Sequence, residues 1–285
     1  MHSHHSEDPQ RRVLGLLRCP VCGERLHAVE RAVECPRRHT FNRARQGYLS
    51  FPTGAVQQAA DSAEMVRARE EFLGAGHFAP LATALAEAAE AHCPPDAAVL
   101  DAGTGTGYYL AAVLEALPEA VGVGLDTSKF ALRRAARAHP RAAAASGDVW
   151  RPLPVGTGEL DLVLDVFAPR NGPEFHRTLR PGGVLAVATP DARHLAELRE
   201  GAGLLAVDSA KDERLRRTLG ERFVQVHAEP VEFALRLEAA ELHRLAAMGP
   251  TAHHVDPAEL RRRIETLGPS CTVTASFRVS VHRAR

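Results

Sequence analysis

The chain has 285 residues, of which 45% are hydrophobic and 25% are charged. These proportions are typical of a globular protein and exclude a disordered chain. No apolar run approaches the roughly 20 residues that a membrane span needs, so we expect no membrane association. The first ten residues are polar and His-rich with no apolar segment behind them, which predicts no secretory signal and a cytoplasmic location.

Basic and acidic residues balance at 35 each, which argues against a surface that coats nucleic acid everywhere. The charge is unevenly distributed, because residues 11–60 hold nine arginines and only three acidic residues. The N-terminal segment is therefore basic and the remainder slightly acidic, which leaves a local contact with nucleic acid open.

The N-terminal segment also contains a pattern of metal ligands. Cys19, Cys22, Cys35 and His39 follow the spacing Cys-x2-Cys-x12-Cys-x3-His. Each close pair presents two ligands from one turn, and four nitrogen or sulfur ligands are what tetrahedral zinc prefers. With all four positions filled, the ion is structural, and its binding stabilises a segment that is too short to fold alone. His27 is the alternative fourth ligand, although its spacing breaks the paired pattern.

The elements that follow are taken in chain order. After a polar linker at 52–62, a helical stretch at 63–91 is interrupted around 74–80. Strands and helices then alternate, which predicts a doubly wound, mostly parallel sheet. The predicted strands are 97–101, 120–125, 142–145, 160–166 and 184–188, and the predicted helices are 106–117, 128–138, 173–179 and 191–200. Alternating apolar residues at 231–237 and 273–281 predict two late strands, each with one buried face, and helices are expected at 238–248 and 256–266.

The first strand of this alternation runs into a glycine-rich turn. Gly103, Gly105 and Gly107 lie between a strand and a helix, where the absence of side chains lets a ligand approach the backbone. The third glycine falls one residue too early for the dinucleotide pattern, which disfavours a pyrophosphate. Asp126 closes the second strand, where a carboxylate accepts hydrogen bonds from ribose hydroxyls. Together with Asp101 they predict S-adenosylmethionine as cofactor, the alternative being a purely structural turn.

Two further segments follow strands at the edge where ligands bind in such sheets. Asp148, in GDVW, is a candidate acceptor for the adenine amino group or a simple helix cap. The segment after the fourth strand, LVLDVFAPRN, places Asp165 and Phe167 at the reaction centre. Phe167 and Trp150 are candidates for stacking on a substrate base, with core packing as the alternative.

Taken together, these motifs resemble a known family along the whole chain. The resemblance rests on the cysteine and histidine spacing, HTFNRARQGYLSF after it, DSAEMVRAREEFLGAGHFAPL at 61–81, LDAGTGTGYY, FAPRN, LRPGG and ATPDARHLAEL. The sequence is similar to the zinc-containing 23S rRNA (guanine-N1)-methyltransferases of the RlmA type. Within this family, RRAARAHPRA and VFAPRN resemble the macrolide-resistance subgroup of actinomycetes, the tylosin-resistance type.

The resemblance implies further features. It implies that Gly105, Thr106, Phe78 and His194 contact the cofactor, where Phe78 stands at a position that can be tyrosine in relatives. It also implies a substrate in hairpin 35 of 23S rRNA, resistance to tylosin-type or mycinose-bearing macrolides, and pairing into a homodimer. The basic residues near the last zinc ligands would contact RNA phosphates, with a solvated charged surface as the alternative; these are Arg37, Arg38, Arg43 and Arg45.

We therefore expect an α/β protein with a class I S-adenosylmethionine-dependent methyltransferase fold and a small N-terminal zinc-binding domain. The expected parts are a polar tail at 1–10, the zinc-binding domain at 11–52, a linker and helical segment at 53–93 and the methyltransferase domain at 94–285. The expected reaction is methylation of guanine N1, with Asp165, Asp148 or a water as the proton acceptor. The alternatives are a methyltransferase acting on a small antibiotic intermediate and a non-catalytic RNA-binding zinc protein.

Overall fold

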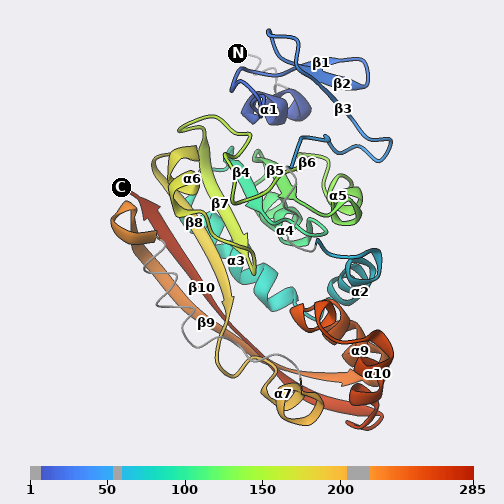
Figure 1. Ribbon diagram of the computed structural model, residues 1–285. Coiled ribbons are helices and arrows are strands. Elements are labelled where there is room, and N and C mark those ends of the chain that lie inside the picture. The colour runs from blue at the N-terminus through green and yellow to red at the C-terminus, as the bar shows by residue number, and fades with distance from the viewer. Residues whose placement is uncertain (1–7, 54–59, 204–218) are drawn as a thin grey trace.

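The centre of the molecule is a seven-stranded sheet. The computed structural model describes residues 8–53, 60–203 and 219–285 (Figure 1). The strand order is β6-β5-β4-β7-β8-β10-β9, in which β4 to β8 run parallel and β10 runs antiparallel to β8 and β9. The strands are β4 (Ala98–Ala102), β5 (Val121–Asp126), β6 (Ala142–Ser146), β7 (Leu160–Val166), β8 (Leu179–Pro190), β9 (Phe223–Glu238) and β10 (Ser270–Ala284). The predicted doubly wound, mostly parallel sheet is confirmed.

One face of the sheet is covered by helices. Leu81 and Leu85 of α3 and Leu110 and Leu114 of α4 pack with strand residues in one buried cluster, and Leu132 of α5 packs on Ala144 nearby. The helices of the described residues are α1 (Pro9–Leu16), α2 (Ala63–Gly74), α3 (Ala79–His92), α4 (Tyr108–Ala116), α5 (Lys129–Ala135), α6 (Gly172–Thr178), α7 (Ala196–Ala202), α9 (Ala239–Ala247) and α10 (Pro257–Glu265). The late part of the chain adds the short 3₁₀ turns η1 (Gly220–Arg222) and η2 (Pro250–His253).

The opposite face is covered mainly by the N-terminal segment. Residues 147–159, which connect β6 to β7, contain no helix. In its place α1 contacts β5 and β6, and the N-terminal side chains Val13, Leu17 and Leu49 join Val123 and Val163 of the sheet in one buried cluster. The zinc-ligand segment is therefore continuous with the core of the sheet and does not form a separate globule.

The zinc-ligand segment itself is a small antiparallel sheet. β1 (His27–Val29) pairs with β2 (Ala32–Glu34), which pairs in turn with β3 (Thr40–Asn42). Val33 and Phe41 face each other in this register and are both buried. After β3, Leu49 pairs with Ala145 of strand β6, which anchors the end of the segment to the main sheet.

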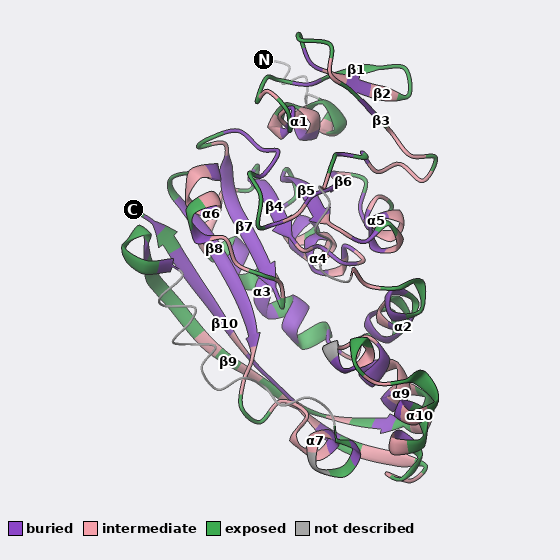
Figure 2. Ribbon diagram, in the orientation of Figure 1, coloured by how far each residue is buried: buried purple, intermediate pink, exposed green. Residues whose placement is uncertain are grey.

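The two predicted C-terminal strands are present, and one of them differs from the prediction. Both were expected to have one buried face, which holds for β9 and is wrong for β10. β10 lies between β8 and β9 and is buried on both faces, including Ser276, Ser280 and His282. β9 is the edge strand, so its apolar positions Val231 and Phe233 are only half-buried (Figure 2). The predicted helix at 191–200 is shorter and begins at Ala196.

None of the described helices is both long and apolar enough to cross a membrane.

Candidate metal centre and cofactor site

Four ligand atoms of the N-terminal segment converge. The Sγ atoms of Cys22 and Cys35 are 3.6 Å apart, and Nδ1 of His39 lies 3.5 Å from Sγ of Cys19 and 3.4 Å from Sγ of Cys35. All four donor atoms lie within 4.8 Å of one another. A tetrahedral zinc ion with ordinary bond lengths requires about 3.8 Å between two sulfurs and about 3.5 Å between sulfur and nitrogen. The geometry therefore fits zinc closely.

The two ligand pairs come from two tight turns. The N–H of Gly23 donates to the carbonyl of Cys19 at 2.8 Å, and the N–H of Arg38 donates to the carbonyl of Cys35 at 2.8 Å. These turns lie side by side because the hairpin of β1 and β2 folds the second pair back onto the first. The alternative ligand His27 lies exposed in β1 and is not part of the cluster.

The glycine-rich turn connects β4 to α4 at the C-terminal edge of the sheet. Gly103 and Gly107 have φ values of 86° and 82°, in the left-handed region that favours glycine. A Cβ atom at Gly103 would lie 2.5 Å from Cβ of Ala168, and one at Gly107 would lie 2.7 Å from Cβ of Ala138. The turn can therefore keep this shape only with glycine at both positions.

Two carboxylates lie at this turn. Oδ2 of Asp126 accepts from the N–H of Gly105 at 2.9 Å, and its Oδ1 accepts from the N–H of Ser128 at 2.8 Å. Burial raises the pKa of Asp126, although these two hydrogen bonds oppose the shift. Asp101 accepts from the hydroxyl of Thr104 at 2.7 Å, and burial raises its pKa to about 7. Each oxygen of Asp126 keeps a second lone pair for the hydroxyl of a ligand.

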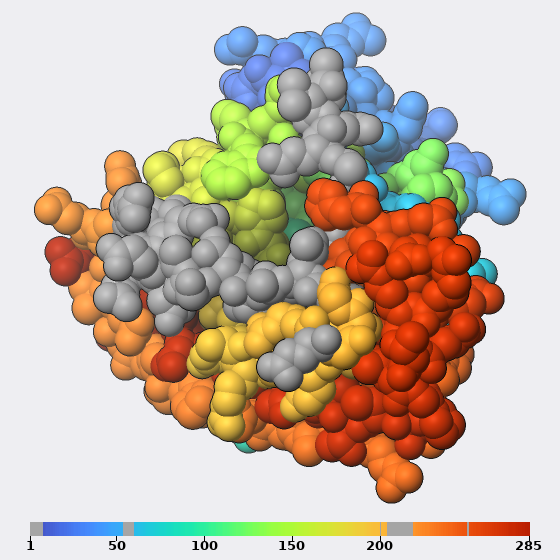
Figure 3. All heavy atoms as spheres, turned by 60° about the horizontal axis from the view of Figure 1, so that its bottom comes forward, coloured from blue at the N-terminus to red at the C-terminus, as the bar shows by residue number. Residues whose placement is uncertain are grey.

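The sequence interpretation missed a cation above this turn. Arg69 of α2 pairs with Asp61, and its guanidinium donates to the carbonyl of Met248 at 2.9 Å. Nη1 of Arg69 lies 3.5 Å from where a Cβ of Gly105 would stand. Nε2 of His253 lies 3.2 Å from Oδ1 of the same Asp61. The part of the chain after β9, which contains His253, therefore borders the glycine-rich turn. In Figure 3 the C-terminal segment, in red, lies beside the yellow segment of the chain. The 61–81 segment was used for the family resemblance, but its arginine carried no chemical signal by itself.

Tyr109 is a second residue that the sequence interpretation missed. Its hydroxyl is buried and has no hydrogen-bond partner among the described residues. Burial raises the pKa of Tyr109, so the hydroxyl stays protonated and available as a donor. A buried hydroxyl without a partner beside the glycine-rich turn fits a site that is completed by a polar ligand.

Phe78 and His194, which the resemblance assigns to the cofactor, lie in one aromatic cluster. The centroids of their rings are 6.2 Å apart. The ring centroid of Phe277 of β10 lies 5.0 Å from that of Phe78 and 4.5 Å from that of His194. Phe78 is buried, and Nδ1 of His194 accepts from the N–H of Ser276 at 3.3 Å. His194 precedes α7 in a turn and is not a solvent-facing helix residue. Their contact with the cofactor stays a prediction.

The loops after β6 and β7 expose two aromatic rings. Trp150 is 55% exposed and Phe167 is 43% exposed, so neither is packed in the core. The side-chain amide of Asn171 donates to the carbonyl of Val149 at 2.9 Å, which connects the two loops. Phe167 has a φ of 58°, a strained conformation that the surrounding structure must stabilise. Asp148 accepts from the N–H of Trp150 at 3.0 Å and is half-buried.

Asp165 lies fully buried at the end of β7. Nε of Arg170 is 3.0 Å from its Oδ1. Burial raises the pKa of Asp165 well above its ordinary value, and the charge of Arg170 opposes that shift. The carboxylate therefore faces its own loop, with no surface open to a substrate.

The arginines predicted to contact RNA lie around the zinc-ligand segment. Arg37, Arg38 and Arg45 are exposed, whereas Arg43 is half-buried and donates to the carbonyl of Gly47 at 3.1 Å. The structure thus groups the four metal ligands in the N-terminal segment, and it places buried Asp165 close enough to Asp101 for the two carboxylates to interact.

Comparisons with known proteins agree with this arrangement. Residues 17–51 match a zinc-ribbon family model described as RlmA, N-terminal, and residues 99–183 match a model described as a methyltransferase domain. A 23S rRNA (guanine(748)-N(1))-methyltransferase of Streptomyces fradiae is 46% identical over 278 residues, which cover 96% of this chain and 99% of that protein. A protein of Micromonospora griseorubida with the name "Putative 23S rRNA (guanine-N(1)-)-methyltransferase" is 49% identical over 286 residues, covering 94% and 97%.

Among solved structures, the similarity extends to the fold. A chain in the complex of the Haloferax volcanii Trm112 methyltransferase activator with a methyltransferase aligns with a TM-score of 0.51 and 20% identity. The alignment covers 81% of this chain and 99% of that chain.

Proposed function

Because the chain belongs to the family of 23S rRNA (guanine-N1)-methyltransferases, we propose that it methylates N1 of a guanine in the hairpin 35 loop of 23S rRNA, with S-adenosylmethionine as methyl donor. The observation that carries the proposal is the similarity to a 23S rRNA (guanine(748)-N(1))-methyltransferase over 96% of this chain, in a chain that combines a Cys₃His cluster with a glycine-rich turn. The proposed consequence is resistance to tylosin-type macrolides. We place the reaction in the cytoplasm, and a homodimer remains part of the proposal.

The residues of the glycine-rich turn would hold the cofactor. Asp126 would accept the ribose hydroxyls, and the backbone around Gly105 and Thr106 would contact the amino-acid part. Arg69 and the hydroxyl of Tyr109 add a cation and a donor on the side of the turn where the C-terminal segment lies. When bound, the cofactor supplies a methyl group on a positively charged sulfur.

The loops after β6 and β7 would hold the target base. A guanine inside a duplex hides N1 in its base pair, so the base must be unpaired or flipped out. The exposed rings of Phe167 and Trp150 offer surfaces on which such a base can stack, which positions N1 for in-line transfer. The next residue, Ala168, packs closely on Gly103 and so connects this loop to the glycine-rich turn.

The proton of N1 must leave during the reaction. Asp165 remains a candidate acceptor from the sequence, but its burial against Arg170 favours a role in holding the loop around Phe167. We therefore propose that solvent water takes the proton, with half-buried Asp148 as the other candidate. An Asp165→Asn variant should then keep the pH profile of turnover while losing thermal stability. A shifted pH profile would show instead that Asp165 accepts the proton.

Primer extension tests the proposed reaction directly. The chain would be expressed in bacteria that lack their own enzyme for this hairpin, and their 23S rRNA would be reverse-transcribed. Methylation at N1 blocks Watson–Crick pairing, so we expect a new stop in the hairpin 35 loop. An Asp126→Ala variant, which loses the proposed ribose acceptor, is the matched control and should give no stop.

The absence of a stop with a zinc-loaded, cofactor-binding protein would contradict the proposal. That result would favour another RNA or a small molecule as the methyl acceptor. A stop outside hairpin 35 would keep the reaction but overturn the proposed position.

A further inference from the structure

Helix α5 carries a row of cations to which the proposed reaction gives no role. Lys129 and Arg133 are one helical turn apart, and Arg137 follows one turn later, just after the helix ends. This spacing places Lys129 and Arg133 on one side of the helix, and Arg137 continues the row into the turn that follows. None of the three forms an ion pair with a described carboxylate, whereas Arg134 on the neighbouring side pairs with Glu70 at 3.0 Å.

An aromatic ring stands among these cations. Nζ of Lys129 lies 5.2 Å and Cζ of Arg133 lies 5.4 Å from the centroid of the Phe130 ring, which is half-exposed. Nε of Arg133 is buried without a hydrogen-bond partner in the described part of the chain. Cations interleaved with an aromatic ring are typical of surfaces that bind single-stranded RNA through phosphates and bases.

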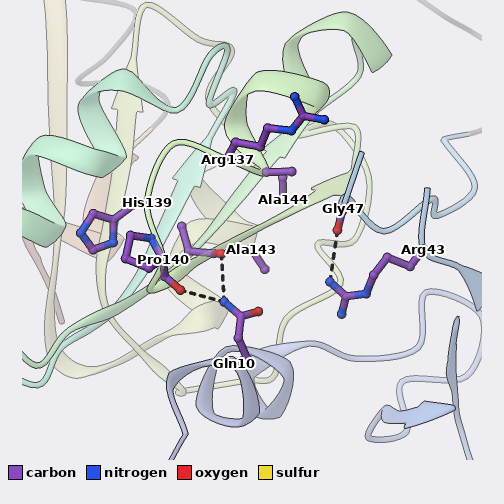
Figure 4. Close-up of a pocket in the computed structure, with 10 residues that line it drawn as sticks. Gln10, Arg43, Gly47, Arg137, His139, Pro140, Ala143 and Ala144 are labelled. Carbon is purple, nitrogen blue, oxygen red and sulfur yellow. Dashed lines mark hydrogen bonds between the residues drawn. The ribbon is translucent and has the colours of Figure 1, made fainter. Parts of the chain in front are cut away.

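The row ends in a groove between the N-terminal segment and the region from the end of α5 to β6. A cavity of about 360 Å³ is lined by Gln10 of α1, Arg43 and Gly47 after β3, and Arg137 and 142–144 on the other side (Figure 4). Its charged side chains are Arg43 and Arg137, and none of the carboxylates that the structure describes lines it. Small side chains at Ala136 and along β6 leave the space open. Such a groove suits an anion.

The position of α5 connects this groove to the cofactor. Ser128, the N-cap of α5, donates its N–H to the carboxylate of Asp126, so the helix begins beside the ribose acceptor. Lys129 and Arg133 are separated by about 6 Å along the helix axis, and Arg137 lies in the turn after the helix. The cations therefore extend from the proposed reaction site to the edge of the zinc-ligand segment.

We propose that Lys129, Phe130, Arg133 and Arg137, together with the groove beside Arg43, form a binding track for the RNA backbone. The inference rests on the proposed function, because it deepens the contact with the same rRNA substrate. The track guides the strand from the zinc-ligand segment to the cofactor edge, with phosphates on the cations and a base on Phe130.

Arg137→Glu is the sharpest test, because this side chain is exposed and its replacement should not disturb the core. Lys129→Glu, also exposed, tests the other end of the track. Arg236→Glu is the matched control: Arg236 is also exposed but lies on β9, at the opposite edge of the sheet. Each variant would be prepared as the full zinc-loaded chain, and the RNA would be a hairpin 35 stem-loop.

Binding would be measured by fluorescence anisotropy at several salt concentrations. We expect Arg137→Glu to weaken RNA binding about tenfold at 0.1 M salt and to reduce the slope of log K against log salt by about one for each phosphate that the variant no longer binds. KM for the RNA should rise to the same extent, while kcat at saturating RNA and the affinity for S-adenosylmethionine stay at wild-type values. Arg236→Glu should match the wild type in every respect.

Two failures can be told apart. If the wild type methylates the stem-loop and Arg137→Glu binds it as tightly as Arg236→Glu does, the track is wrong and the proposed function stands. If the wild type neither binds nor methylates the stem-loop, the proposed function fails and the track, which depends on it, falls as well.

Discussion

The two faces of the central sheet are covered in different ways. On one face α3 and α4 pack their leucines against the strands, in the usual manner of alternating strands and helices. On the other face the connection from β6 to β7 has no helix, and α1 and the zinc-ligand segment take its place. One face is thus covered by helices that are neighbours of the strands in the sequence. The other face is covered by a segment that begins more than 100 residues before the connection from β6 to β7.

Because of this difference, the zinc stabilises the cover of the central sheet as well as the N-terminal segment. Cys19 and Cys35 belong to the same buried cluster as Leu100 and Leu185 of the sheet. The ion that holds the ligand turns together also holds the layer that keeps water from one face of the sheet. We therefore expect metal loss to affect the cofactor-binding part as well as the N-terminal segment.

Removal of the zinc should have the largest effect. Cys35→Ala deletes a fully buried ligand, and structural zinc contributes on the order of 10–16 kcal/mol to the folding of small modules. That amount is comparable with the whole stability of a typical protein, about 5–15 kcal/mol. We expect the variant, or the wild type treated with a chelator, to lose its cooperative thermal transition and its binding of S-adenosylmethionine. Unchanged cofactor affinity after metal removal would mean that the two parts fold independently.

Truncation of one leucine on each face compares the two layers directly. Leu49 lies after β3 on the N-terminal face and Leu114 lies in α4 on the helical face, and both are almost completely buried. Replacement of either by alanine should cost about 2–5 kcal/mol, because a cavity remains in a packed core. Urea unfolding measures both losses. A cost below about 1 kcal/mol for Leu49→Ala alone would show that the N-terminal layer is only loosely packed.

The helical face also buries a carboxylate whose titration can be followed. Asp101 has a pKa raised to about 7 by burial, so the folded protein binds a proton that the unfolded chain has released. Stability therefore falls as pH rises between about 4 and 7, and about 1 kcal/mol of that loss falls between pH 6 and 7.5. Asp101→Asn should remove this part of the pH dependence. Exposed Asp96→Asn, just before the same strand, is the control and should leave the profile as in the wild type.

The helical face was predictable from sequence, and the other was not. Strand β7 and the helices α3 and α4 follow from local hydrophobic patterns, and β7 has the predicted bounds Leu160–Val166. The cover over the other face depends on contacts such as Leu49 with Ala145, which no local pattern encodes. The burial of β10 on both faces was missed for a related reason, since alternation of apolar residues does not tell whether a strand lies at the edge of a sheet or between two other strands.

The site was predictable where one motif carries its own geometry. The spacing of the cysteines and His39 gave the metal cluster, and the glycines gave the cofactor turn. Arg69 and Tyr109 could not be found in this way, because their importance comes from packing against distant segments. Asp165 was placed at the correct strand end, but sequence could not show that Arg170 would cover it.

Polar links between α1 and the sheet should contribute least. The guanidinium of Arg12 donates to the carbonyls of Glu119 and Asp96, at 2.7 Å and 2.8 Å, and so connects α1 to the loops before β5 and β4. These hydrogen bonds are exposed to water, which competes for both partners, so Arg12→Ala should cost only about 0.5–1 kcal/mol. Arg11→Ala, next to it and exposed, should cost almost nothing. If Arg12→Ala proves as costly as Leu49→Ala in urea unfolding, polar contacts and not apolar burial attach the N-terminal layer to the sheet.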